Sequence, residues 1–368
     1  IEQGGTRRIK VRDDGVGIPH DQLELAVSRH ATSKITSLSD LEQVTSLGFR
    51  GEALPSIASV SHFEIVSSFS GDDSGWMYEV HGGDSGEIQP QPHPPGTTIE
   101  VKDLFYNVPA RRKFLKTERT EYTHIEQLVR RLALSHFDTA FEFHHNQRQS
   151  LRLKSADSMD AMTARVSTIC GNAFAENSIF IDESGAGLRL WGWLALPTFS
   201  RSQADLQYFF VNRRSVRDKL VIHAARQAYQ DVLYHGRQPA YVLHLEMDPA
   251  MVDVNAHPAK TEVRFRESRL IHDFIYRTLQ KAIAEATPSD QASSFAAENL
   301  IPENSRPVQG SVSLGQKDYP WSGVTASQTD IAEEMVSYER LYQAAGEIAS
   351  DSSTDESPPM GYALAQLH

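Results

Sequence analysis

Four short segments of the chain carry residue types that suit a phosphorylated ligand. The first is the run Asp13-Asp14-Gly15-Val16-Gly17, which follows an alternating stretch, Arg8 to Arg12, that predicts a strand. A carboxylate at the end of a strand can accept a hydrogen bond from an exocyclic amine. Gly15 and Gly17 let the backbone approach a flat ligand because they have no Cβ. On so short a match, an ordinary acidic turn explains these residues at least as well.

The second and third segments offer donors for a polyphosphate. Thr32, Ser33 and Lys34 supply two hydroxyls and an ammonium in succession, although a polar helix C-terminus with its usual basic residue is the alternative. The third segment consists of Gly48, Phe49, Arg50, Gly51, Glu52, Ala53 and Leu54. Its two glycines permit a backbone nest that binds anions before a predicted helix. The segment also suits a lid over a nucleotide.

The fourth segment is Gly96-Thr97-Thr98, where the Thr97 hydroxyl could support the Asp13 carboxylate directly or through water. An ordinary strand start is the alternative there. The sequence contains no Gly-x-x-x-x-Gly-Lys-Ser/Thr loop, no glycine-rich dinucleotide fingerprint and no Cys/His group with zinc spacing. The pair His144-His145 is assigned to a solvated loop. Cys170 has apolar neighbours and is predicted to be a packed thiol in a reducing compartment.

Strand and helix patterns alternate along the chain and must position these segments. Helical spacing occurs at 20–30, 218–233 and 268–286, and in a stripe formed by Ile125, Leu128, Val129 and Leu132. Strands are predicted at 97–101, 137–143, 188–194, 206–211, 241–247 and 262–265. A polar stretch at 144–158 predicts a domain boundary.

The charge is unevenly distributed. The chain carries a net charge of −12, but residues 288–368 hold twelve acidic and three basic residues, so 1–287 carries only −3. The tail is rich in Ser, Gln, Glu, Asp and Pro, which predicts a disordered linker in which only 331–349 shows helical spacing. Because most of the acidic residues lie in the tail, the body can still present basic patches to a nucleic acid. No apolar run is long enough to predict a membrane span.

Taken in order, four longer blocks resemble the MutL family of DNA mismatch repair proteins. They are Arg29-His30-Ala31-Thr32-Ser33-Lys34, Gly48-Phe49-Arg50-Gly51-Glu52-Ala53-Leu54, the stretch from Asp103 to Phe114, and the stretch from Val252 to Lys260. The resemblance covers Ile1 to about Ala286. It implies an α/β fold: a GHKL (Bergerat-type) α/β sandwich at 1–155, a ribosomal-S5-domain-2-like α/β domain at 156–287 and an acidic disordered linker at 288–368.

The resemblance also implies roles for the site residues, with ATP and Mg²⁺ as cofactors. Asp13 would read the adenine amino group, Gly15 and Gly17 would line the base and ribose, and Thr97 would support Asp13. Thr32, Ser33, Lys34 and the lid from Gly48 to Leu54 would hold the phosphates. Lys260 would reach the γ-phosphate and so distinguish ATP from ADP.

Family members carry, on a helix upstream of the first motif, a glutamate that acts as general base and an asparagine that binds magnesium. The chain begins after that helix, so no residue is assigned as the catalytic base and no metal ligand is named. We therefore expect an ATPase in the intact protein and an inactive fragment here.

A cluster of four cations, Arg213, Arg214, Arg217 and Lys219, follows a predicted strand and opens a helix, so its charges are expected to project together. By resemblance this cluster contacts the DNA backbone without sequence preference, with Lys219 the strongest candidate. For a second cluster, Arg111 to Lys116, a solvated face is as good an explanation as a role in bracing the ATP lid or the fold.

The resemblance implies a cytoplasmic, nucleoid-associated homodimer without membrane contact. It would couple a MutS-type mismatch recognition protein to a downstream nuclease and helicase as an ATP-dependent switch or clamp. Two alternatives stay open: another GHKL ATPase, either a chaperone or a topoisomerase subunit, or a DNA-binding scaffold that uses no nucleotide.

Overall fold

The structure is a computed structural model that describes residues 1–29, 31, 51–72, 74–234, 236–253 and 263–286. Its first sheet is entirely antiparallel and has the strand order β1-β6-β2-β3-β4, with β5 beside β3. These strands are β1 (Arg8–Arg12), β2 (His62–Ser68), β3 (Trp76–His81), β4 (Asp84–Ser85), β5 (Gln89–Pro90) and β6 (Gly96–Lys102).

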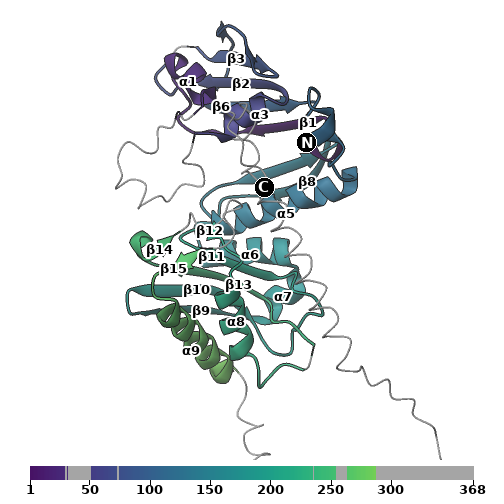
Figure 1. The fold of residues 1–368 in the computed structure, drawn as a ribbon. Helices are drawn as coiled ribbons and strands as arrows, with labels where there is room; N and C mark the ends of the chain where they lie inside the picture. Colours follow the sequence, from purple (N-terminus) through teal and green to yellow (C-terminus); the bar gives the residue numbers. More distant parts are fainter. Residues whose placement is uncertain (30, 32–50, 73, 235, 254–262, 287–368) are drawn as a thin grey trace, which may run out of the picture. The chain divides into compact units, whose positions relative to one another are not determined.

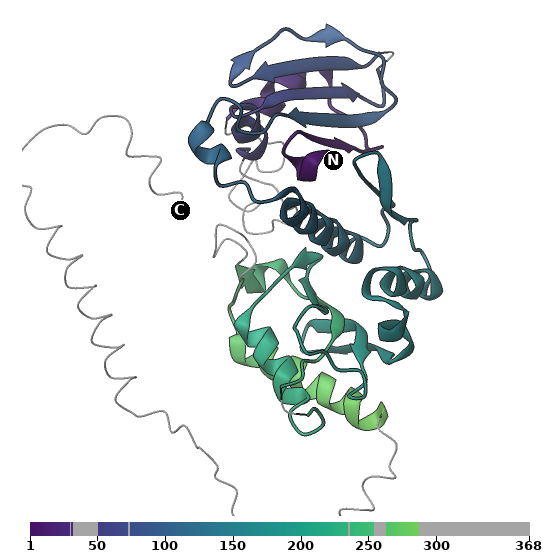
Figure 2. The same cartoon turned by 90° about the vertical axis from the view of Figure 1, so that its right-hand side faces the viewer.

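Two short helices, α1 (Leu23–Val27) and α3 (Ala53–Ala58), lie against one face of this sheet (Figures 1 and 2). Their residues Leu23, Val27 and Ala58 join Phe63 and Ile65 of β2 in one buried cluster. Phe63 and Ile65 are two residues apart, so the pleat turns both toward the helices. Ile9 of β1 also packs against this cluster, so the core supports the strand that leads to Asp13.

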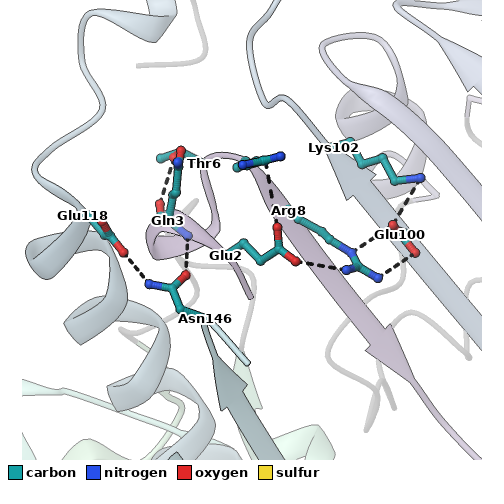
Figure 3. Close-up of polar contacts among 9 residues, drawn as sticks. Glu2, Gln3, Thr6, Arg8, Glu100, Lys102, Glu118 and Asn146 are labelled. Atoms are coloured by element: carbon teal, nitrogen blue, oxygen red, sulfur yellow. Dashed lines mark hydrogen bonds and ion pairs between the residues drawn. The ribbon is translucent and has the colours of Figure 1, made fainter. Parts of the chain in front are cut away.

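The start of β1 is anchored by a network of charged and polar groups (Figure 3). Arg8 pairs with Glu2 at 3.0 Å and with Glu100 at 2.9 Å, and Lys102 also reaches Glu100, at 3.2 Å. Burial opposes the ionisation of Glu100, but hydrogen bonds and charges from Lys102 and Arg8 outweigh it and lower the pKa of that carboxyl. Asn146 accepts from the Gln3 backbone N–H at 3.0 Å.

The second sheet has the order β12-β11-β13-β10-β9, with β11 and β13 parallel and the other neighbours antiparallel. The strands are β9 (Ser178–Gly185), β10 (Leu188–Ala195), β11 (Gln207–Val211), β12 (Arg214–Ser215) and β13 (Tyr241–Glu246). Two hairpins, β7 (Phe141–His145) with β8 (Arg148–Leu153) and β14 (Val252–Asp253) with β15 (Arg264–Phe265), complete the strands that the structure describes.

Both faces of the second sheet are buried. Leu243 and Leu245 of β13 face α8 (Lys219–Ala228) and α9 (Ser268–Ala286), whereas Val242 belongs to a second cluster with residues of α5 (Glu118–Ser135) and α6 (Met159–Cys170). Alternate residues of one strand thus enter two cores, which explains its nearly continuous apolar sequence. The other α-helices within the described residues are α4 (Pro109–Arg112) and α7 (Asn172–Glu176). Among the described residues, no helix combines the length and the apolar character of a membrane span.

Several predicted elements are confirmed, notably the strand Arg8–Arg12 and the helix Ser268–Ala286. Others need correction. The strand predicted at 137–143 starts at Phe141. In the helix predicted at 20–30, a 3-10 turn comes first and the α-helix α1 covers only Leu23–Val27. The helix predicted at 218–233 ends at Ala228.

The predicted boundary at 144–158 overlaps the β7–β8 hairpin, in which His144 and His145 are strand residues. In the α5 stripe, Leu128 is 53% exposed and does not belong to the core. The predicted tail, with its helical stretch 331–349, lies outside the described residues. The domain bounds stay predictions.

Candidate functional site

Asp13 lies at the end of β1, next to the beginning of β6. Its backbone N–H donates to the Thr97 carbonyl at 2.9 Å, which continues the β1–β6 ladder by one residue. One carboxylate oxygen accepts from the Gly15 N–H at 3.0 Å. The carboxylate is exposed, and within the described residues its second oxygen accepts no hydrogen bond. Asp13 is therefore fixed in position while an acceptor faces outward.

Two glycines permit the close backbone packing around Asp13. Gly17 has φ 77°, and a Cβ there would overlap the Ser68 carbonyl oxygen at the end of β2. Gly96 has φ 120°, and a Cβ there would overlap the Asp13 carbonyl oxygen. Both conformations disfavour any other residue. The 13–17 loop is thereby held against the ends of β2 and β6.

Ser67 of β2 connects the parts of this loop, although none of the four motifs includes it. It is fully buried, and its Oγ accepts from the Ile18 N–H at 2.8 Å and lies 2.9 Å from the Thr97 Oγ1. Thr97 thus meets Asp13 through its backbone, whereas its hydroxyl contacts Ser67. The signal in the sequence is the small polar pair Ser67-Ser68, which directly follows the apolar pair Ile65-Val66.

The third predicted segment is described only from Gly51 onward. Gly51 has φ 61°, and a Cβ there would overlap the carbonyl oxygen of Ala31, so the residue just before the second segment lies against the middle of the third. Glu52 and Ala53 are exposed at the start of α3, and Leu54 packs against the core that Ile18 also contacts. The predicted site residues outside the described part are Thr32, Ser33, Lys34, Gly48, Phe49, Arg50 and Lys260.

The four cations around β12 do not project together. Arg217 and Lys219 are exposed, and Arg213 pairs with Asp138 at 2.9 Å. Arg214 is only 5% exposed, and burial lowers its pKa. The prediction of one projecting cluster is therefore wrong for Arg214, because its position in β12 turns the side chain inward.

Lys219 is the first residue of α8, whose N-cap Asp218 accepts from the Leu220 N–H at 2.8 Å. A cation at a helix N-terminus faces the positive end of the helix dipole, which costs about 0.3–1 kcal/mol. The helix itself gives no reason for a lysine at this position.

Two further expectations concern metals and thiols. The described residues contain no group of three or more His, Cys, Asp or Glu side chains arranged to hold a metal ion. Burial raises the pKa of Cys170 to about 12, which agrees with a packed, unreactive thiol.

Comparison with known proteins adds the family. A model described as "DNA mismatch repair protein, C-terminal domain" matches residues 166–284. The chain is 50% identical to the DNA mismatch repair protein MutL of Cellvibrio japonicus and 48% identical to that of Pseudomonas putida strain GB-1. In both cases the match covers 100% of this chain and 63% of the relative. The chain thus spans a little under two thirds of the length of these relatives.

Solved structures agree on the fold. The N-terminal domain of a DNA repair protein matches 77% of this chain and 87% of that domain, with a TM-score of 0.64 and 22% identity. The Aquifex aeolicus MutL ATPase domain complexed with ADP matches 73% of this chain and 85% of that domain, with a TM-score of 0.51 and 25% identity. The predicted GHKL-type α/β fold is confirmed. Because the chain is 50% identical to a curated relative over the whole of its own length, it belongs to the MutL family of DNA mismatch repair proteins.

Proposed function

We propose that this chain is the nucleotide-binding part of an ATP-dependent switch in DNA mismatch repair. One observation carries the proposal: the Asp13 carboxylate is fixed at a strand end with an oxygen facing outward, in a loop that the packing of Gly17 and Gly96 holds in place. A fixed, exposed acceptor of this kind fits a base that carries an exocyclic amine. The ADP complex of the Aquifex aeolicus relative supports an adenine nucleotide as the ligand.

In this proposal Asp13 accepts from the adenine amino group, and Gly15 and Gly17 lie against the base and ribose. Ser67 and Thr97 hold the loop in place. Thr32, Ser33, Lys34 and the lid from Gly48 to Leu54 bind the phosphates, with Mg²⁺ as counter-ion. When bound, ATP supplies a terminal phosphate that ADP lacks. Lys260 contacts that phosphate, and only such a differential contact can shift a conformational equilibrium.

The biological role follows from the family and is proposed for the whole protein. The nucleotide-driven switch links a MutS-type recognition protein to a downstream nuclease and helicase, acts as a cytoplasmic homodimer, and contacts DNA through Arg217 and Lys219. The curated relatives support mismatch repair over a chaperone or topoisomerase role.

The nucleotide site is tested with Asp13→Asn in the full chain. Asn keeps the shape but replaces one acceptor with a donor, so we expect the affinity for ADP and a non-hydrolysable ATP analogue to fall about tenfold or more. Isothermal titration calorimetry measures it. Asp14→Asn is the matched control, since it removes the same charge one residue away. Equal affinities for the two variants would remove Asp13 from the site.

The DNA contact is tested with Lys219→Glu. We expect weaker binding to duplex DNA and a salt dependence shallower by about one unit of slope, because one phosphate contact is lost. The variant should fold at least as stably as the parent, since glutamate suits a helix N-terminus. Fluorescence anisotropy over a range of salt concentrations measures the slope. An unchanged slope argues against Lys219.

A further inference from the structure

Helix α8 carries a polar stripe that runs from Lys219 toward its C-terminal end. Lys219, His223 and Arg226 are spaced four and three residues apart, so they lie on one face of the helix. All three are exposed. The opposite face is buried and contains Val221, Ala224, Ala225 and Ala228. At about 1.5 Å per residue, the stripe leads some 10 Å along the helix from Lys219 to Arg226.

The stripe ends at an open pocket of about 490 Å³. Arg226 and Arg237 line it together with Gln230 and Tyr234, and the buried Tyr229 forms part of its wall. The Tyr229 hydroxyl donates to the Ala195 carbonyl of β10, which fixes this side chain in place. The pocket therefore has a fixed wall and a rim of charged, amide and aromatic side chains.

The two guanidinium groups of this pocket have neutral partners. Arg226 donates to the Gln238 Oε1 at 2.9 Å, and Arg237 donates to the Ser200 Oγ at 3.1 Å. In the described part of the chain, neither has a carboxylate within ion-pair distance. By contrast, Arg189 pairs with Asp182 at 2.8 Å. Arg226 and Arg237 therefore keep an uncompensated charge and free donors, which suits an anion such as a phosphate.

Tyr234 adds an aromatic surface to these charges. Its side chain is 87% exposed. The Arg237 N–H donates to the Tyr234 carbonyl at 3.1 Å and so closes a turn. Gly236 in this turn has φ 79°, a conformation that favours glycine. The turn is tied to the neighbouring loop by reciprocal backbone bonds between Gln238 and Arg201. An aromatic ring exposed on an anchored turn is a suitable stacking surface for a base.

We propose that this pocket binds unpaired nucleotides of a single-stranded nucleic acid. Arg226 and Arg237 hold backbone phosphates, and a base stacks on Tyr234. The inference rests on the proposed DNA contact of Arg217 and Lys219, which begins the same stripe at the other end of α8. An acidic peptide would use the arginines but not the stacking surface or the continuous stripe, so the observations favour a nucleic acid.

The test measures binding of the full chain to a deoxythymidine oligonucleotide of about 16 nucleotides and to a duplex of the same length. Tyr234→Ala should lower single-strand affinity at least about fivefold and leave duplex affinity within about twofold, because only an unpaired base can stack. Tyr234→Phe keeps the ring and should retain the affinity. Since Tyr234 is exposed, circular dichroism should be unchanged.

The phosphate contact is tested with Arg226→Gln, which should make the single-strand salt slope shallower by about 0.7. Arg189→Gln makes the same charge change at an ion-paired arginine and should leave the slope unchanged. Equal losses for single strand and duplex with Tyr234→Ala, or no loss, would overturn the proposal. If Lys219→Glu has no effect while Tyr234→Ala does, the pocket stands and the proposed contact at Lys219 fails.

Discussion

Gly17 shows how a single residue can determine the geometry of the proposed nucleotide site. Its φ of 77° and the Ser68 carbonyl oxygen beside it leave no room for a Cβ. For Gly17→Ala we predict a loss of unfolding free energy of about 2 kcal/mol or more, from backbone strain plus displacement of the loop. Nucleotide affinity should fall as well, because Asp13 belongs to the same loop. Denaturation and calorimetric titration measure the two effects.

Gly83→Ala is the control for this prediction. Gly83 has φ 101°, but a Cβ there would meet no atom within 4 Å. The substitution should cost about 1 kcal/mol in strain and leave nucleotide affinity unchanged. If both variants lose nucleotide affinity equally, the effect is one of general stability rather than of the Gly17 contact.

Among single residues, the motifs predicted Asp13 and Thr97 as neighbours, and their backbones do meet. Gly17 lies against Ser68 instead. Ser67 was not predictable in the same way. A serine in a strand has no spacing rule, and its importance comes from three groups brought to it by the sheet register: the Ile18 N–H, the Gly96 carbonyl and the Thr97 hydroxyl. Such convergence is visible only after folding.

Among the elements, β1 depends on the charge network around Glu100. The pKa of Glu100 is lowered in the folded chain, so its contribution to stability is present above the ordinary value of 4.5 and is lost as the pH falls below it. At pH 7, Glu100→Gln leaves Arg8, Lys10 and Lys102 near a neutral group. It should cost about 1–2 kcal/mol, moderated by the partial exposure of the three cations.

Hydrogen exchange of the amides in β1 and β6 measures this cost for the sheet itself. The difference between Glu100→Gln and the parent should begin to shrink as the pH falls below 4.5, where the unfolded chain takes up the proton first. It should vanish only below the lowered pKa of the folded carboxyl, where the folded parent is neutral too. Glu87→Gln, at an exposed position, serves as the control. A difference that stays constant from pH 7 to about pH 3 would show that the charge of Glu100 does not support β1.

Elements were predictable where one face is strongly apolar. In α9, Ile271, Ile275 and Leu279 recur every four residues and are all buried, so the helix was predicted with its observed bounds. Strand β9 was not predicted because Ile181 is its one buried residue and Phe180 is 39% exposed. An edge strand held mainly by backbone pairing with β10 leaves little periodic signal.

For the whole molecule, the order of the motifs predicted the family and the fold class, but not how the sites communicate. Lys260 and most of the proposed lid lie in segments outside the described residues, and no local pattern reports a long-range contact. A switch is a property of two sites together. A test of the switch must therefore measure how binding at one site changes the affinity at the other.

Reciprocal linkage is that test. If a non-hydrolysable ATP analogue changes the DNA affinity of the chain by some factor, DNA must change the affinity for the analogue by the same factor, commonly about 5- to 150-fold. Lys260→Ala should bring this factor close to one while leaving ADP binding intact, because the proposed contact is to the terminal phosphate alone. Anisotropy for DNA and calorimetry for nucleotide, each with and without the other ligand, give the two factors. Factors of one in the parent chain would mean that both ligands bind without coupling, and a DNA-binding scaffold would then explain the chain better than a switch.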